Sequence, residues 1–168
     1  MSVDITARVA GPGSDVFVDA AWELKERIRR EEGVLKQRRS FFDDAYRRAT
    51  VDLLLAGARG AEGTLDDGKL VAFVATRRDG YILFLAVDPA HRGEGFGRRL
   101  VAAVAEDHAT VSCHARASNE AAIAFYEHVG FAVERRIDRY YEDGGAAYYL
   151  KLGDSGGLRR RLSEFVRR

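Results

Sequence analysis

Three glycines, Gly93, Gly95 and Gly97, alternate with other residues in one short segment, and Arg92 and Arg98 flank them. A strand-like apolar run precedes this segment, and an apolar helical pattern follows it. Because glycine has no Cβ atom, such a backbone can turn tightly and approach a ligand closely. Free N–H groups at the start of a helix attract anions. The segment therefore predicts a phosphate-binding loop between a strand and a helix.

The glycine spacing alone leaves two interpretations open. A dinucleotide-binding fingerprint needs a glycine three residues after Gly95, where this chain has Arg98. No Gly-Lys-Ser or Gly-Lys-Thr follows, so the segment is not a P-loop. A tight structural turn therefore explains this motif about as well as a phosphate site does.

Length and charge predict a single cytoplasmic domain. The chain has 168 residues, 46% of them hydrophobic, and 27 basic side chains balance 26 acidic ones. This balance gives no global field for nucleic acid or membranes. A single cysteine, Cys113, excludes an internal disulfide, and no signal peptide or spanning segment is evident. We expect a folded domain over 1–153 and a flexible basic tail over 154–168.

Hydrophobic periodicity predicts a mixed α/β sheet with helices on both faces. Helices are expected after the caps Ser14 and Ser40, from the glycine segment, and from Asn119. The segment 50–58 could continue the second helix, but its β-branched start favours a strand. Strands are predicted over 3–10, 50–58, 70–76, 81–87, 110–115, 131–140 and 147–152. The resulting order is β-α-α-β-β-β-α-β-α-β-β.

A second motif lies downstream, where Asn119 opens a helix that carries Phe125-Tyr126 and stops at Gly130-Phe131. Together with Arg92-x-x-Gly-x-Gly, in this order, it resembles the GNAT superfamily of N-acetyltransferases. The resemblance covers roughly residues 50–152. It implies the GNAT fold, in which the fourth and fifth strands splay apart.

The resemblance also implies that acetyl-CoA is the cosubstrate and that no metal takes part. Asn119 would contact the cofactor, and the Tyr126 hydroxyl would protonate the departing thiolate, whose pKa of about 8.5 makes it a fair leaving group. Packing in the core is the alternative role for Tyr126. The implied cofactor-binding residues are Leu85, Ala86, Val87, Arg92, Gly93, Gly95, Phe96, Gly97, Arg98 and Asn119.

On the acceptor side, an amine attacks a thioester only when it is uncharged, so a group must accept its proton. Tyr81 and His114 lie in segments similar to those of protein Nα-acetyltransferases, in which a Tyr and a His hold the deprotonating water. Simple packing on the sheet is the alternative for both. Tyr140 and Tyr141 resemble the pair that clasps a peptide backbone, although Ala146 replaces the usual Asp.

A protein N-terminus is the leading acceptor. An α-amine titrates near about pH 8 and a lysine side chain near about 10.4, so the α-amine supplies more neutral nucleophile at pH 7. The segment 33–39 lacks the Pro-Glu loop of the eukaryotic enzymes, which keeps a small amine or a lysine side chain open. A non-catalytic CoA-binding module whose Arg-rich tail docks on RNA or ribosomes is a further alternative. The chain could be a monomer or a homodimer.

Overall fold

Two sheets lie side by side in the computed structural model, which describes residues 4–57 and 68–153. Antiparallel pairing joins the first four strands in the order β1-β2-β3-β4. A smaller antiparallel sheet has the order β5-β7-β6. The strands are β1 (Asp4–Ala10), β2 (Thr50–Gly57), β3 (Lys69–Thr76), β4 (Ile82–Val87), β5 (Val111–Arg116), β6 (Ala132–Ile137) and β7 (Ala147–Leu152).

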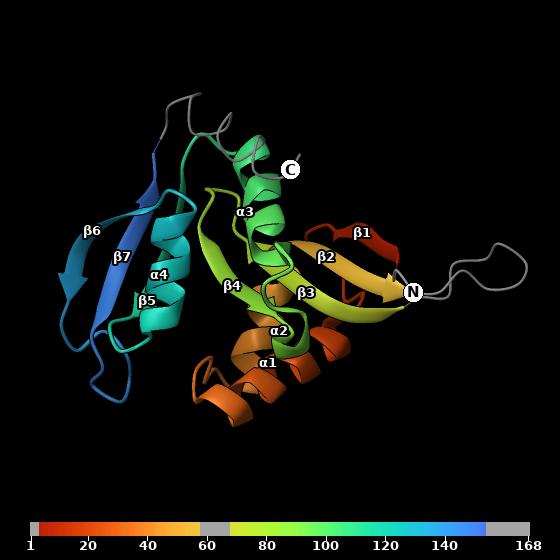
Figure 1. The fold of residues 1–168 in the computed structure, drawn as a ribbon. Coiled ribbons are helices and arrows are strands. Elements are labelled where there is room, and N and C mark those ends of the chain that lie inside the picture. Colours follow the sequence, from red (N-terminus) through yellow and green to blue (C-terminus); the bar gives the residue numbers. More distant parts are fainter. Residues whose placement is uncertain (1–3, 58–67, 154–168) are drawn as a thin grey trace, which may run out of the picture.

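The helices cover both faces of the larger sheet, as Figure 1 shows for α1 and α2 on one side and α3 on the other. Two apolar clusters result, one built with α1 and α2 and the other with α3 and α4. The helices are α1 (Val18–Glu32), α2 (Arg39–Arg48), α3 (Phe96–Asp107) and α4 (Glu120–His128), with a short 3-10 turn, η1, at Pro89–His91. The predicted element order is confirmed.

Two predicted helix starts are wrong. The helix α1 begins at Val18 rather than next to Ser14, because Phe17 adopts a left-handed conformation before it. The Ser14 hydroxyl instead accepts a hydrogen bond from the Val16 N–H within a turn. Ser40 lies inside α2, whose N-cap position is held by Arg38. Serine is a favoured N-cap residue, but the conformation of the surrounding backbone starts both helices at other positions.

Other predictions of local structure hold. The ambiguous segment is the strand β2, and it lies between β1 and β3 in the sheet. Asn119 caps α4, since its side chain accepts a hydrogen bond from the Ala122 N–H. The strand β6 is shorter than predicted and ends at Ile137, before the turn that carries Arg139 at a φ of 54°. The predicted tail and the connection 58–67 lie outside the described residues.

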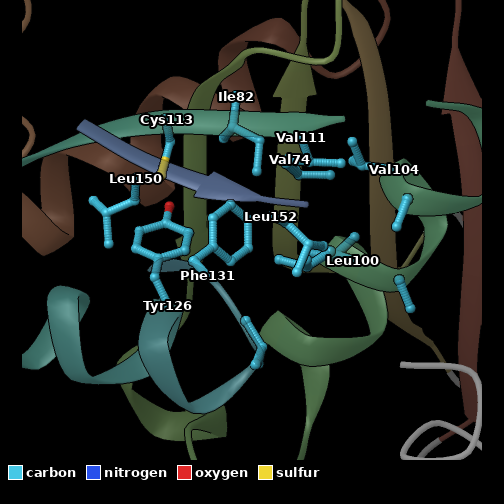
Figure 2. Packing of buried hydrophobic residues seen from close by; sticks show 14 of the residues in the cluster. Val74, Ile82, Leu100, Val104, Val111, Cys113, Tyr126, Phe131, Leu150 and Leu152 are labelled. Carbon is cyan, nitrogen blue, oxygen red and sulfur yellow. The ribbon is translucent and has the colours of Figure 1, made fainter. Parts of the chain in front are cut away.

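The two sheets touch at one end and diverge at the other. Tyr81 and Ser112 form an isolated parallel bridge between the start of β4 and β5, and the Ser112 N–H donates to the Gly80 carbonyl. Beyond this bridge, β4 and β5 form no ladder within the described chain. The expected splay is thus confirmed, and Figure 1 shows the two strands separating. The α3–α4 cluster fills the junction with side chains from both sheets (Figure 2).

Candidate active site

A cavity of about 970 Å³ opens where β4 and β5 separate. Its walls come from all six residues of β4, from the glycine loop with the start of α3, from β5 and α4, and from two further loops, 34–38 and 141–143. Among residues 4–57 and 68–153, no strand pairs with the second edge of β4 beyond the Tyr81–Ser112 bridge, so the backbone groups of that edge are available to a ligand. Divergence of the strands therefore creates the site.

The glycine loop has the geometry that the sequence predicts. Gly93 and Gly95 have φ values of 83° and 85°, in the left-handed region that favours glycine. Gly95 occupies the N-cap position of α3, so the unpaired N–H groups of that helix start at the cavity wall. A Cβ atom on Gly97 would lie 3.0 Å from the Phe125 ring. This close approach holds the start of α3 against α4.

Two residues predicted at the cofactor have partners within the protein. Arg92 forms a two-point ion pair with Glu32 at the end of α1, with Nη2 and Oε2 3.1 Å apart. Glu32 and Arg92 both line the cavity. Asn119 lines the cavity as well, while its side-chain oxygen caps α4. The positive charge beside the loop is therefore partly balanced by Glu32.

Tyr126 lies deep in the cavity wall and is 8% exposed. Figure 2 shows its oxygen directed at the Cys113 sulfur, to which the hydroxyl donates a hydrogen bond. Burial, followed by the neighbouring thiol, raises the pKa of the Tyr126 hydroxyl well above its usual value. Burial also raises the pKa of the Cys113 thiol to about 12. Both groups therefore keep their protons at neutral pH, and Cys113 is not an activated nucleophile.

Tyr81 and His114 meet across the bridge between the sheets. The Tyr81 hydroxyl lies 2.7 Å from His114 Nδ1. Burial, together with the positive charges of Arg135 and Arg77, lowers the pKa of His114. Burial is also the main reason that the pKa of Tyr81 is raised. At neutral pH the pair is thus an uncharged imidazole bonded to an uncharged phenol.

The paired tyrosines take different positions at this site. Tyr140 stacks on the His114 ring at a centroid distance of 4.5 Å, whereas Tyr141 lines the cavity. The adjacent Asp143 accepts hydrogen bonds from Arg116 on β5 at 2.9 and 3.1 Å. Asp143 also accepts from the Gly145 N–H. Asp143 thus orders the turn after Tyr141, in which Ala146 replaces the Asp of the similar family segment.

The cavity contains most of the residues that the sequence singled out. His114, Tyr126, Tyr141 and every predicted cofactor-binding residue line it. Tyr81 and Tyr140 do not: Tyr81 contacts the cavity-lining His114, and Tyr140 contacts both His114 and Tyr141. Sequence reasoning missed Glu32 and Phe41, which also line it. It considered the segment 33–39 only for the Pro-Glu loop that this chain lacks, and the structure places residues 34–38 in the cavity wall.

No group of three or more His, Cys, Asp or Glu side chains in residues 4–57 and 68–153 could hold a metal ion. No helix within those same ranges is long and apolar enough to cross a membrane.

Several known proteins are similar to this chain in sequence and in fold. Over 80 residues, the chain is 40% identical to N-alpha-acetyltransferase 30 of Homo sapiens, which covers 45% of this chain and 22% of the human protein. It is 34% identical over 103 residues to N-alpha-acetyltransferase RimI of Mycobacterium tuberculosis, covering 56% of this chain and 65% of that one. The crystal structure of the ribosomal-protein-S18-alanine N-acetyltransferase from Escherichia coli superposes with a TM-score of 0.67 at 25% identity, covering 89% and 95% of the two chains.

A family profile matches a longer part of the chain than either of these two pairwise sequence alignments. The Acetyltransferase (GNAT) family profile matches residues 21–131, which run from α1 to the residue before β6. This range includes the glycine loop, Tyr81, His114 and Tyr126. Because the match spans more than half of the sequence and the fold agrees, the chain belongs to the acetyltransferase (GNAT) family.

Proposed function

We propose that this protein transfers the acetyl group of acetyl-CoA to a primary amine by direct attack, and that its acceptor is the α-amine of a polypeptide. One observation carries the proposal: a single cavity joins an anion-binding helix start to a buried phenol and, on the opposite strand, to a neutral imidazole. Each of these three parts matches a different requirement of acetyl transfer.

The residues at the glycine loop fit acetyl-CoA. Its pyrophosphate would lie against the N–H groups at Gly95, Phe96 and Gly97, where the helix start favours negative charge. The pantetheine arm would follow the free edge of β4 at Leu85, Ala86 and Val87. When bound, acetyl-CoA supplies an activated acyl group as a thioester. The chain then has to supply only orientation and proton transfer.

His114 is the base in this proposal. In one neutral tautomer, Nδ1–H donates to the Tyr81 oxygen and Nε2 keeps a lone pair that can accept a proton. The lowered pKa of His114 keeps that lone pair free at neutral pH. Tyr81 is a positioning residue, because it touches His114 and does not line the cavity. The proton leaves the amine through His114, directly or by way of one water.

Tyr126 is the acid that protonates the departing thiolate. Its raised pKa means that the hydroxyl carries a proton at the time of the reaction. Its partner in the structure is a thiol, which is a weak acceptor, so the hydroxyl can redirect its hydrogen bond at small cost. The phenol would exchange the Cys113 sulfur for the sulfur of the leaving group. In the free enzyme, the Tyr126 hydroxyl is thus already directed at a sulfur atom, the same kind of atom that it would protonate in the leaving group.

A polypeptide α-amine is favoured over other amines for three reasons. A neutral histidine is a mild base, and an α-amine loses its proton more easily than a lysine side chain does. The relatives that match this chain are themselves named as N-alpha-acetyltransferases or as a ribosomal-protein alanine acetyltransferase. The loops 34–38 and 141–143 also line the cavity, and the first residues of a chain would lie against them.

The experiment that tests the activity offers acceptors in competition. Full-length protein is incubated with acetyl-CoA and an equimolar pool of heptapeptides with different first residues, Nα-blocked lysine peptides and small amines. Mass spectrometry then identifies which acceptor gains one acetyl group. Acetylation of free α-amines is expected. Acetylation confined to lysine side chains or small amines would replace the acceptor, and acetyl-CoA binding without any product would indicate a non-catalytic module.

The role of Tyr126 predicts a selective kinetic defect. Tyr126→Phe should lower kcat by about 10²- to 10⁴-fold, the range that general acid catalysis supplies, and leave the Kd for acetyl-CoA nearly unchanged. Calorimetry gives the Kd, and release of free CoA gives kcat. Cys113→Ala is the matched control, because it removes the partner and leaves the phenol. An unchanged kcat in Tyr126→Phe would remove the acid assignment.

A further inference from the structure

Lys25 is fully buried on α1, although lysine is among the residues least often buried. Its Nζ atom donates to the Gln37 main-chain oxygen at 2.6 Å and to Glu26 Oε1 at 3.1 Å. The same atom lies 4.4 Å from the centroid of the Trp22 ring. A carbonyl, a carboxylate and an aromatic face thus surround an ammonium group that has three protons to share.

The carbonyl that Lys25 holds belongs to the loop between α1 and α2. This loop is neither helix nor strand, and its residues 34–38 all line the cavity. Leu35, within it, has a φ of 58°, a left-handed conformation that costs free energy in a residue with a Cβ atom. A loop that holds such a conformation needs contacts from outside itself to keep it. The hydrogen bond from Lys25 to the Gln37 main-chain oxygen is one such contact.

The opposite side of the loop has weaker contacts. Lys36 lies 4.0 Å from Asp143, and Arg38 lies 3.8 Å from Glu142, and all four residues line the cavity. Both ion pairs are largely exposed, so each contributes little and weakens in salt. The buried contact made by Lys25 is therefore the stronger determinant of where the loop lies.

We propose that Lys25 is a positioning residue that fixes the loop 34–38 and thereby the binding of the acceptor's first residues. The inference rests on the proposed function, because it assigns the part of the cavity that the loop 34–38 lines to the acceptor. Lys25 does not line the cavity, so it acts through the Gln37 backbone and not on the substrate.

A purely structural role for Lys25 makes a different prediction. Burial lowers the pKa of Lys25, which means that the fold bears a cost to keep the ammonium charged. Replacing a buried charge by an apolar side chain of similar size is often neutral for stability, or even favourable. Lys25→Met should therefore keep a Tm within about 5 °C of wild type, while the loop loses its anchor. Stability and acceptor binding should separate in this variant.

Two measurements on the full chain test the proposal. Hydrogen exchange of the peptide covering 33–38 should become faster in Lys25→Met, and so should tryptic cleavage after Lys36 and Arg38. With the heptapeptide that wild type acetylates fastest, KM for the peptide should rise about 5- to 10-fold, the equivalent of one lost hydrogen bond. The KM for acetyl-CoA should stay within about twofold.

Two further variants complete the test. Lys151→Met removes a lysine from β7, remote from the loop, and should change neither exchange nor peptide KM. Lys25→Gln keeps one N–H donor and should lie between wild type and Lys25→Met, which preserves the test if the Met variant folds poorly.

The failure of this inference differs from failure of the proposed function. Unchanged exchange at 33–38 in a folded, active Lys25→Met enzyme overturns the role of Lys25 alone. An equal rise in both KM values overturns it as well, because a general loosening of the fold would affect both substrates. A wild-type protein that acetylates no peptide contradicts the proposed function, and with it the acceptor role of the loop.

Discussion

His114 illustrates how single residues in this protein take their chemistry from neighbours on other elements. Tyr81 bonds to its Nδ1 atom, Tyr140 stacks on its ring, and Tyr149 lies 5.1 Å from it between ring centroids. Arg135 and Arg77 are the cations that, after burial, lower its pKa. Neither arginine touches the imidazole through a hydrogen bond given by the structure. Their effect on His114 is therefore electrostatic.

This arrangement predicts how activity depends on pH. Because the pKa of His114 is lowered, the imidazole stays neutral at pH values below the ordinary pKa of histidine. We therefore expect kcat/KM to fall only as the pH drops through that lowered pKa. Arg135→Met removes a repelling cation, so the pKa should rise and the acidic limb should move to higher pH. A pH–rate profile measures the shift.

Arg136→Met is the control for this prediction. Arg136 is next to Arg135 on β6, but it pairs with Asp138 and is not among the groups that shift His114. The acidic limb should stay in place in this variant. If the two variants gave the same profile, His114 would not be the titrating base.

At the scale of elements, the cofactor site depends on where α3 begins. Gly95 supplies a left-handed N-cap with open space around it, so only its backbone conformation requires glycine. Gly97 is constrained differently, by the Phe125 ring of α4. The loop therefore combines a conformational requirement with a steric one. Both direct the start of α3 toward the gap beside β4.

Gly95→Ala tests the conformational requirement. A Cβ in the left-handed region costs about 1–2 kcal/mol, and the strained N-cap should turn its N–H groups away from the phosphate position. We expect the Kd for acetyl-CoA to rise about tenfold or more, an effect that calorimetry detects. Gly13→Ala is the matched control, because Gly13 has a φ of 90°, open space around it, and no place in the cavity wall. Equal Kd values in both variants would exclude this loop as the phosphate site.

At the scale of the whole molecule, one junction between two sheets both supports the fold and creates the cavity. The sheets are pinned at Gly80, Tyr81 and Ser112, and they separate beyond that point. The same contact brings Tyr81 next to His114. A change at this junction should therefore alter stability and activity together.

Gly80→Ala tests the junction. Gly80 has a φ of 85°, and an added Cβ would overlap the Thr110 main-chain oxygen, which no side-chain rotation can relieve. Strain and overlap together should cost about 2–5 kcal/mol of the free energy of unfolding, and thermal unfolding would measure the loss. The Gly13→Ala variant carries strain without overlap, so the difference between the two isolates the junction. Equal Tm values would mean that the sheets are not held there.

Much of this protein is determined by the sequence alone. Short-range patterns identified each helix and strand, since the apolar period and the turn residues act within a few positions. The glycine loop and the Asn119 cap were also predictable, because backbone conformation and local hydrogen bonds require particular residues there. Ser14 and Ser40 satisfied the same local rules and were nevertheless misplaced, because the path of the chain around them decided otherwise.

Only the tertiary structure decided which distant groups meet. The Tyr81–His114 hydrogen bond joins residues 33 positions apart, and the Arg92–Glu32 pair joins residues 60 positions apart. Lys25 reads as part of a charged helix face until the fold places the Gln37 carbonyl over it. No local pattern encodes such contacts, because they depend on how complete elements pack. The sequence determined the elements and the loop, and packing determined the environment that gives the site its chemistry.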